Sequence, residues 1–379
     1  MFFVEKTKGL NYFKQFDYFL FICVLLLSAI GILALYSATL SKESGPSTMA
    51  KQAIMLGIGI ILAIIISSLD YKSFKTIGIV FYLVSIVLLV YVIFKGTGAS
   101  KWGSNSWIRI GGFSFQPSEI AKITFVIVVS TFLERIKEGQ EHMKKNIAKV
   151  IIYSAIPILL VMLQKDFGTS IVFIFMFFVM IFISGIPYKY IFGSIVASVP
   201  CALYIWFFQF NDKRRNRILY FLNPEADGGD AGFQILRSIR AIGSGKIFGK
   251  GLFKGVLTQK GAVPVNESDF IFTVIGEELG FIGSSLVVIV IFALLMRCMY
   301  IAKNSRDPYG TFVVVGLTAM MGFHFIENIG MNISILPITG IPLPFFSQGG
   351  SAMLTNYIAI GIILSVSMRR KRTIFNSSQ

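Results

Sequence analysis

Residues 16–40 read FDYFLFICVLLLSAIGILALYSATL, a stretch long enough to decide the fold class. A helix needs about 20 consecutive apolar residues to cross the hydrocarbon core of a bilayer. The stretch follows Lys6, Lys8 and Lys14, and it lacks a small-x-small cleavage site. We therefore interpret it as a retained first membrane helix rather than a signal peptide.

The same apolar character extends through the whole chain. Of the 379 residues, 55% are hydrophobic and only 14% are charged, whereas a soluble domain carries about 25% charged residues. This composition excludes a disordered chain, a secreted disulfide scaffold and an ordinary cytosolic enzyme, and it indicates an all-α polytopic membrane protein. The net charge of +16 fits lysine and arginine at cytoplasmic helix ends, so no nucleic-acid partner is predicted.

Apolar stretches predict ten membrane helices. They are 16–40, 52–69, 76–94, 117–134, 150–164, 168–186, 190–209, 270–296, 311–329 and 352–368. Lysine and arginine are more frequent in the segments that are inside when the N-terminus is inside, which favours both termini in the cytoplasm. We expect a single membrane domain over residues 1–379, with a large extracytoplasmic loop, 211–269, between helices 7 and 8.

Three segments on the predicted outer face differ from plain connectors. Residues 95–119 are rich in Gly, Ser and aromatic residues, 211–269 form the large loop, and 330–351 are apolar but interrupted by prolines. Irregular apolar backbone near a membrane is tolerated only where protein or a cavity satisfies its polar groups. We therefore expect the functional site on this face.

Acidic residues mark the point where the large loop enters a span. Asp269 is the last charged residue before the apolar stretch, so it is either a helix N-cap or a partly desolvated carboxylate that can act as a base. Glu277 and Glu278 lie about two turns deeper, where charge is costly and therefore indicates function. They could instead pair with Arg or Lys from the loop.

The large loop contains one segment with helical spacing. Apolar residues at 235, 236, 239 and 242 share a face, and Arg237 and Arg240 lie on another. Such a helix either lies on the leaflet or forms a cationic wall for the phosphates of a lipid headgroup, because the guanidinium fork matches phosphate oxygens.

Further charged residues lie at or inside the predicted spans. Lys122 lies about one turn into its stretch, near Glu119, and Asp166 lies in an outer break, so an ion pair between Lys122 and Asp166 is geometrically reasonable, whether structural or catalytic. His324 and Glu327 are one helical turn apart inside a span. They could form a proton relay or a hydrogen bond between packed helices.

The motifs of the chain, taken in order, resemble the shape, elongation, division and sporulation (SEDS) family of bacteria. They are WIR (107–109), FQPSEIAK (115–122), QKDFGT (164–169), AIGSG (241–245), SDFIF (268–272), GEELG (276–280), NIGM (328–331) and LPITGIPLPFFSQGGS (336–351). The sequences GM (330–331) and GIPLP (340–344) are more similar to the RodA branch than to the FtsW branch. Gln348 and Ser334 depart from the usual pattern.

The resemblance implies a ten-helix fold in the bacterial cell membrane with both termini cytoplasmic. It also implies peptidoglycan glycosyltransfer, in which lipid II is polymerised into β-1,4-linked glycan strands and undecaprenyl pyrophosphate leaves. This activity serves cell-wall elongation and shape. The implied partner is a class B penicillin-binding protein, which crosslinks the strands.

The resemblance also assigns residues. Asp269 matches the family's catalytic residue, Lys122 and Asp166 match its interacting pair, and Trp107 and Arg109 match its first functional outer loop. A further motif residue, Ser347, lies in the third irregular segment.

The implied reaction fits these residue types. An α-linked sugar pyrophosphate that forms a β bond inverts its configuration, so one displacement with one general base suffices. The departing pyrophosphate requires cations, for which Arg109, Lys122 and the basic loop are candidates. A divalent ion, Mg²⁺ or Mn²⁺, is compatible with this chemistry, although the sequence shows no metal-ligand spacing.

Two other functions compete with the enzyme. A lipid II flippase would use a cavity between helices, with His324 and Glu327 as polar elements, and a scaffold would only recruit a transpeptidase. A flippase needs polar groups throughout the membrane depth, whereas the charged residues here gather at one face. The sequence therefore favours the glycosyltransferase.

Overall fold

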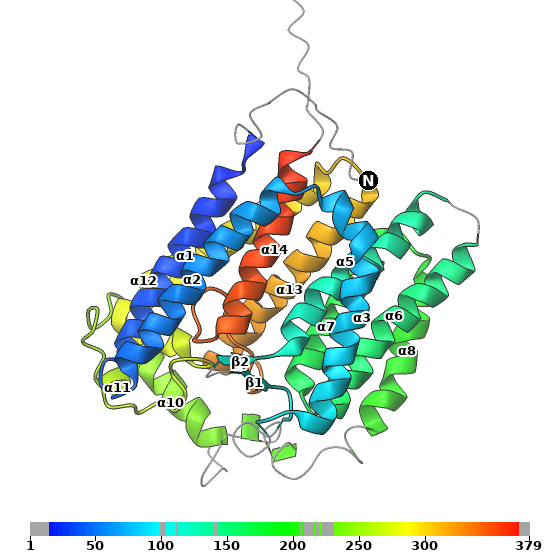
Figure 1. Ribbon diagram of the computed structural model, residues 1–379. Helices are drawn as coiled ribbons and strands as arrows, with labels where there is room; N and C mark the ends of the chain where they lie inside the picture. Colours follow the sequence, from blue (N-terminus) through cyan, green and yellow to red (C-terminus); the bar gives the residue numbers. More distant parts are fainter. Residues whose placement is uncertain are drawn as a thin grey trace, which may run out of the picture.

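The computed structural model describes residues 15–98, 104–110, 113–139, 142–204, 207, 215–216, 220–221 and 231–370, which fold into a bundle of long helices (Figure 1). Eight of the described helices are long and apolar enough to cross a membrane. They are α1 (Tyr18–Thr39), α2 (Gly45–Ser68), α3 (Tyr71–Lys95), α6 (Met143–Leu163), α7 (Phe167–Ser184), α12 (Ile271–Lys303), α13 (Pro308–Asn332) and α14 (Gly350–Met368). The chain is therefore a multi-pass membrane protein, as predicted.

Two further helices occupy the remaining predicted stretches. They are α5 (Pro117–Lys137) and α8 (Tyr188–Tyr204). Helix α5 packs against α3, α6 and α13 in the middle of the bundle. Because nearly all its side chains are buried in protein, α5 accommodates Glu119, Lys122 and Glu134, which a lipid-facing helix would not.

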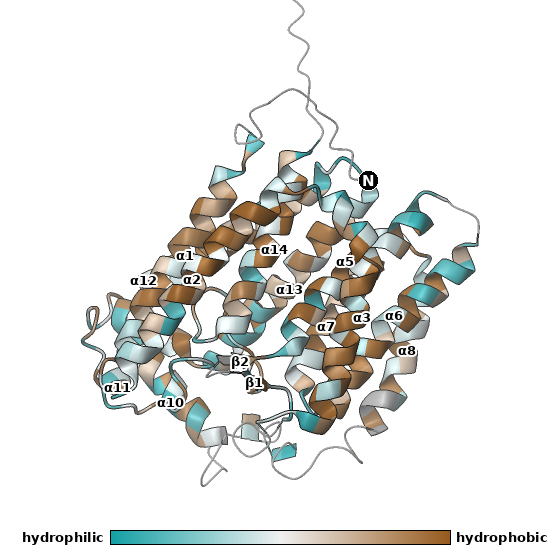
Figure 2. Ribbon diagram, in the orientation of Figure 1, coloured by the Kyte–Doolittle hydropathy of each residue, from teal (hydrophilic) through white to brown (hydrophobic). Residues whose placement is uncertain are grey.

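The outer helices show the opposite pattern. On α3, Phe81, Val87 and Phe94 are 54%, 66% and 78% exposed, and Figure 2 shows that hydrophobic residues also predominate along the neighbouring helices. These side chains face the lipid, whose hydrocarbon solvates them as well as a protein core would.

The helix boundaries follow local capping signals. Helix α2 begins at Gly45 rather than at 52, because Pro46 occupies its first turn, where a missing N–H costs nothing. Between α6 and α7, Lys165 adopts a φ of 63° and Asp166 accepts a hydrogen bond from the Thr169 N–H at 3.2 Å. This break separates the two predicted spans.

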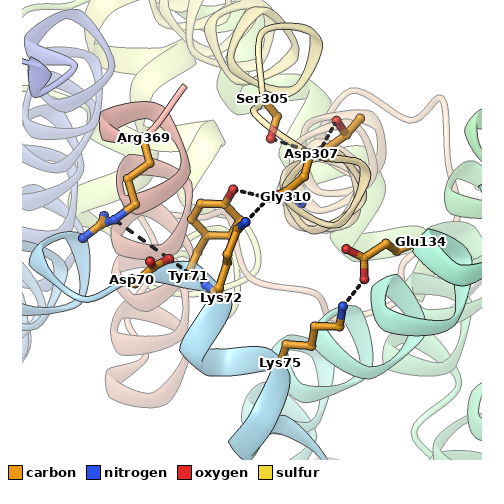
Figure 3. Close-up of polar contacts among 10 residues, drawn as sticks. Asp70, Tyr71, Lys72, Lys75, Glu134, Ser305, Asp307, Gly310 and Arg369 are labelled. Carbon is orange, nitrogen blue, oxygen red and sulfur yellow. Dashed lines mark hydrogen bonds and ion pairs between the residues drawn. The ribbon is translucent and has the colours of Figure 1, made fainter. Parts of the chain in front are cut away.

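Polar contacts close the side of the bundle that holds the start of α1 and the end of α14 (Figures 1 and 3). The Asp307 carboxylate accepts hydrogen bonds from the Gly310 N–H at 2.8 Å and the Tyr71 hydroxyl at 2.7 Å, and it forms an ion pair with Lys72 at 3.1 Å. Burial opposes the charge, but these donors hold the pKa of Asp307 below its usual range. Asp307 thereby caps α13 and attaches it to α3.

Two further ion pairs attach α3 to its other neighbours (Figure 3). Lys75 pairs with Glu134 of α5, and Arg369, just after α14, lies 3.9 Å from Asp70. Arg369 also donates to the Ser68 carbonyl at 2.8 Å. These contacts fix the helix ends far from the irregular segments.

The opposite side carries the irregular structure. It holds the hairpin of β1 (Ile108–Ile110) and β2 (Phe113–Phe115), paired antiparallel, and the helices α10 (Ala231–Ser244) and α11 (Val256–Gln259) (Figure 1). The predicted helix near 233–242 is confirmed as α10. Of its predicted apolar face, Ile235 is buried in a cluster with Phe270, Met331 and Ile338, whereas Ile239 is 41% exposed.

Candidate active site

The three irregular segments meet on this side of the bundle, as predicted. The Gln116 N–H donates to the Ser351 hydroxyl at 3.3 Å, and that hydroxyl donates to the Ser114 carbonyl at 3.1 Å. The Gln348 N–H donates to the Glu267 carbonyl at 2.8 Å. Residues distant in sequence thus form one continuous structure around the start of α12.

Asp269 lies at the centre of this structure and is partly exposed. Its backbone carbonyl accepts hydrogen bonds from the side-chain amides of Asn328 at 2.9 Å and Asn332 at 3.0 Å, and the Ser268 hydroxyl donates to its Oδ1 at 2.9 Å. The N-cap alternative is wrong, because α12 begins at Ile271 with Phe270 in the cap position. The structure thus fixes the Asp269 backbone and does not use its carboxylate as a cap.

Ser347 positions the loop that faces Asp269. Its hydroxyl donates to the Ser268 carbonyl at 2.5 Å and accepts from the Leu343 N–H at 2.8 Å. The side chain is buried. Ser347 therefore connects the third irregular segment to Ser268, the residue next to Asp269.

A second carboxylate lies near Asp269. The Thr339 hydroxyl donates to Oε1 of Glu327, whereas the buried Oε2 has no hydrogen-bond partner among the described residues. Glu327 is within electrostatic range of Asp269. A Cβ placed on Gly340, which has a φ of 78°, would lie 3.4 Å from Oδ2 of Asp269, so the loop approaches this carboxylate closely.

Lys122 belongs to a buried polar cluster with Glu119 and His324. Its ammonium donates to Oε1 of Glu119 at 2.9 Å and contacts Nε2 of His324 at 3.0 Å. The Met320 carbonyl, 2.7 Å from Nδ1, can only accept, so Nδ1 carries the hydrogen and Nε2 accepts from Lys122. His324 therefore forms a hydrogen bond between α13 and α5, the packing role considered from the sequence.

The predicted ion pair between Lys122 and Asp166 does not form. Within the described part of the chain, Lys122 pairs with Glu119, because a lysine three residues after a glutamate shares its helix face. Asp166 instead accepts from the Gln116 amide at 2.9 Å and from the Thr169 N–H. Burial raises the pKa of Asp166, while the hydrogen bonds from Thr169 and the charge of Lys122 oppose the rise.

Glu277 is fully enclosed by donors from the large loop. Its carboxylate accepts from the Lys250 ammonium at 2.6 Å, the Leu257 N–H at 2.9 Å, and the Thr258 N–H and hydroxyl, both at 2.8 Å. Glu278 accepts from the Ser37 hydroxyl at 2.5 Å and from two backbone N–H groups of the loop. The pairing of Glu277 with Lys250 confirms the alternative in which these acidic residues pair with a basic residue of the loop. Since these donors occupy both oxygens of the carboxylate, Glu277 holds the loop against α12.

The loop also inserts into a break in α12. Gly280 has a φ of 67°, and backbone hydrogen bonds join 246–251 to 277–282, among them Lys250 N–H to the Glu277 carbonyl at 3.0 Å and Phe281 N–H to the Lys246 carbonyl at 2.8 Å. A Cβ on Gly280 would lie 2.2 Å from the Gly249 nitrogen. Only glycine permits this approach.

The remaining predicted residues lie around the site rather than inside it. Arg237 donates to the Ala262 carbonyl at 2.5 Å and stacks on Phe233 at 4.0 Å, so it packs the loop. Arg240 and Arg109 are exposed. The backbone of Trp107 pairs with Thr97 in an isolated bridge before the hairpin. Of the predicted cations, Arg109 and Arg240 are thus accessible to a ligand, whereas Lys122 is not.

Comparison with known proteins identifies the family to which this fold belongs. The model of the FtsW, RodA and SpoVE family, described as cell cycle protein, matches residues 17–372. The chain belongs to this family. It is 35% identical to stage V sporulation protein E of Bacillus subtilis, over 93% of this chain and 96% of the relative.

Further relatives and solved structures are similar to the chain over nearly its whole length. The chain is 32% identical to the peptidoglycan glycosyltransferase MrdB of Escherichia coli, over 92% of this chain and 93% of the relative. It matches a chain of a peptidoglycan synthase complex with a TM-score of 0.78 and 25% identity, over 93% of this chain and 97% of that one. RodA of Thermus thermophilus matches with a TM-score of 0.70 and 24% identity, over 94% and 98% of the two chains.

Sequence reasoning missed four residues of the site. Asn328 and Asn332 hold the Asp269 carbonyl, Gln116 contacts Asp166, and Thr339 contacts Glu327. Two asparagines four residues apart at the end of a span were an available signal, because they share a helix face. Nothing in the sequence indicated the contacts of Gln116 and Thr339.

The raised pKa of Asp166 has a consequence for stability. Because folding favours the protonated form, the folded protein loses stability as pH rises above 3.8, the ordinary pKa, and through the raised pKa. We expect Asp166→Asn to remove this pH dependence and to change stability by less than about 1 kcal/mol, since asparagine is an equally good N-cap. Denaturant unfolding in detergent at several pH values measures both. A parallel pH dependence in the two proteins would contradict the assignment.

Proposed function

We propose that this chain is a peptidoglycan glycosyltransferase of the bacterial cell membrane. It polymerises lipid II into β-1,4 glycan strands, with release of undecaprenyl pyrophosphate, for cell-wall elongation and shape. The partly exposed Asp269, fixed where three irregular segments meet, carries the proposal. The relative MrdB is itself named a peptidoglycan glycosyltransferase.

The proposed topology has ten spans, with both termini in the cytoplasm. Helices α5 and α8 are added to the eight apolar spans to give ten. Residues 211–269 then form an extracytoplasmic loop between the seventh and eighth spans. Asp269 then lies at the outer surface, where flipped lipid II presents its sugars.

Asp269 acts as the general base. Its carboxylate takes the proton from the acceptor 4-hydroxyl of N-acetylglucosamine while the oxygen attacks the anomeric carbon, and the sugar–pyrophosphate bond breaks with inversion. The amides of Asn328 and Asn332 hold the backbone of the base, so little reorganisation is needed during the reaction.

Cations stabilise the departing pyrophosphate. Arg109 and Arg240 are exposed and can contact phosphate oxygens directly. The Lys122 side chain is 1% exposed, so its ammonium contributes charge from within the protein rather than by contact with the pyrophosphate.

If the reaction uses Mg²⁺ or Mn²⁺, Asp269 and Glu327 are the carboxylates of the described site that would hold it. The carboxylate type fits such an ion, and the buried Oε2 of Glu327 has no hydrogen-bond partner among the described residues. A bound divalent ion would supply positive charge for the pyrophosphate.

A class B penicillin-binding protein is the proposed partner. The support is the likeness to a chain from a peptidoglycan synthase complex that couples polymerisation with crosslinking.

Polymerisation of fluorescent lipid II by the purified chain and its transpeptidase partner tests the proposed function. Moenomycin silences contaminating polymerases of the classical penicillin-binding type. We expect a ladder of glycan strands. If no ladder forms but labelled lipid II crosses vesicles that contain the chain, the protein is a flippase instead.

Variants of Lys122 distinguish two roles for its ion pair with Glu119: a purely structural role and a positive charge that the reaction needs. We expect Lys122→Met to cost about 3–5 kcal/mol of stability, because Glu119 is left as an unpaired buried charge. The double variant Glu119→Gln/Lys122→Met should recover stability, while polymerisation stays at least about tenfold low because the positive charge is gone. Denaturant unfolding and glycan ladders measure the two effects. Recovery of both would make the pair purely structural.

A further inference from the structure

A cavity of about 540 Å³ opens between α6 and α8, away from the candidate active site. It is lined by His142, Met143, Lys144, Lys145, Pro187, Lys189 and Tyr190. The first turns of the two helices form it, on the side of the bundle that holds the start of α1 and the end of α14 (Figure 1). The proposed reaction uses none of these residues.

The charge of the cavity is entirely positive. Three of the lining residues are lysines, none is acidic, and none of the three lysines takes part in an ion pair among the described residues. Lys189 instead lies over the Tyr190 ring, 5.2 Å from its centroid. The three ammonium groups, two on α6 and one on α8, repel each other, so an anion that bridges them would be stabilised.

The backbone adds to this preference for an anion. Helix α6 begins after His142, which has a φ of 74° and makes no side-chain cap hydrogen bond. His142 therefore satisfies none of the first-turn N–H groups with its side chain, and α8 begins at the same cavity. The N-terminal ends of two helices thus contribute partial positive charge beside the lysines.

The surroundings of the cavity indicate a lipid rather than a free ion. Directly next to it, apolar residues of α6, α7 and α8, among them Ile151, Phe177 and Ile181, surround a narrow space of only about 10 Å³, and Tyr190 borders both spaces. Tyr188 and Phe192 are 77% and 68% exposed, as is typical of aromatic side chains at a membrane–water interface. Figure 2 shows the corresponding change from polar to apolar colour along α6.

We propose that this cavity binds the phosphate headgroup of an anionic phospholipid, whose acyl chains lie in the surrounding bilayer beside the exposed Tyr188 and Phe192. Lys144, Lys145 and Lys189 contact the phosphate oxygens. Basic pockets between membrane helices bind such headgroups. The site is independent of glycosyl transfer, so it stands whether or not the proposed function does.

Lipid titration of the full chain in detergent, followed by native mass spectrometry, tests the site. For phosphatidylglycerol, we expect Lys145→Gln/Lys189→Gln to weaken the first binding step about 25-fold, about fivefold for each lysine. Binding of zwitterionic phosphatidylcholine should not change. The matched control Lys303→Gln/Arg306→Gln removes the same charge from exposed residues at the end of α12 and just after it, and it should change binding less than twofold.

Three outcomes would overturn the proposal. The first is equal phosphatidylglycerol affinity in wild type and Lys145→Gln/Lys189→Gln. The second is an equal loss in the control pair, which would show only general attraction to anionic lipid. The third is displacement of the lipid by an excess of inorganic phosphate, which would assign the cavity to a free anion. The replaced side chains are exposed, so unchanged thermal unfolding confirms that each variant is folded.

Discussion

Asp269→Asn should abolish glycan ladders from lipid II while the protein remains folded. Asparagine has the shape of aspartate but cannot accept the proton of the 4-hydroxyl, and a general base contributes about 10²–10⁴-fold to the rate. The backbone carbonyl of residue 269 still accepts from Asn328 and Asn332. Thermal unfolding should therefore change little. Asp269→Glu should also be severely impaired, because the longer side chain displaces the carboxylate.

Glu267→Gln is the matched control for this experiment. Glu267 lies two residues before Asp269, and its carboxylate pairs with Lys42 at 2.5 Å, with both side chains partly exposed. Such a pair contributes at most about 1 kcal/mol, so polymerisation should stay near the wild-type rate. If Asp269→Asn polymerises lipid II as fast as this control, Asp269 is not the base.

The largest effect on stability is expected at Glu277. Glu277→Ala removes an acceptor that is fully buried and leaves Lys250 and the backbone N–H groups of Leu257 and Thr258 without it. Removing one partner of a buried pair costs about 3–5 kcal/mol. We expect the lower part of this range, because the Lys250 side chain is 28% exposed and water can solvate it. Denaturant unfolding of wild type and Glu277→Ala in detergent measures the difference in the free energy of unfolding.

Limited trypsin digestion distinguishes local detachment of the loop from general destabilisation. In Glu277→Ala, cleavage after Lys250, Lys254 and Lys260 should become faster than cleavage elsewhere, since the carboxylate holds this segment against α12. Glu43→Ala is the control, because Glu43 is an exposed glutamate. Wild-type stability and an unchanged digestion pattern in Glu277→Ala would show that the backbone contacts around Gly280 hold the loop alone.

The membrane fold could be predicted from sequence because the bilayer imposes a simple rule. Stretches such as 16–40 and 311–329 must be helical and apolar to cross hydrocarbon, and the structure has α1 and α13 there. The break at Asp166 could be predicted for the same reason, since a charged residue is excluded from lipid. The start of α2 could not be placed from hydropathy, because Gly45 and Pro46 begin the helix before the apolar stretch.

The sequence by itself determined that the chain crosses the membrane several times and that three irregular segments share one face, because apolar length and alternation across the bilayer indicate both. Only the tertiary structure decided the partners of the charged residues. It paired Lys122 with Glu119 and His324 rather than Asp166, and it enclosed Glu277 in loop donors. Contacts such as those of Asn328 with Asp269 depend on how helices stack and rotate. The hydrophobic pattern does not specify that packing, since lipid and protein neighbours are equally apolar.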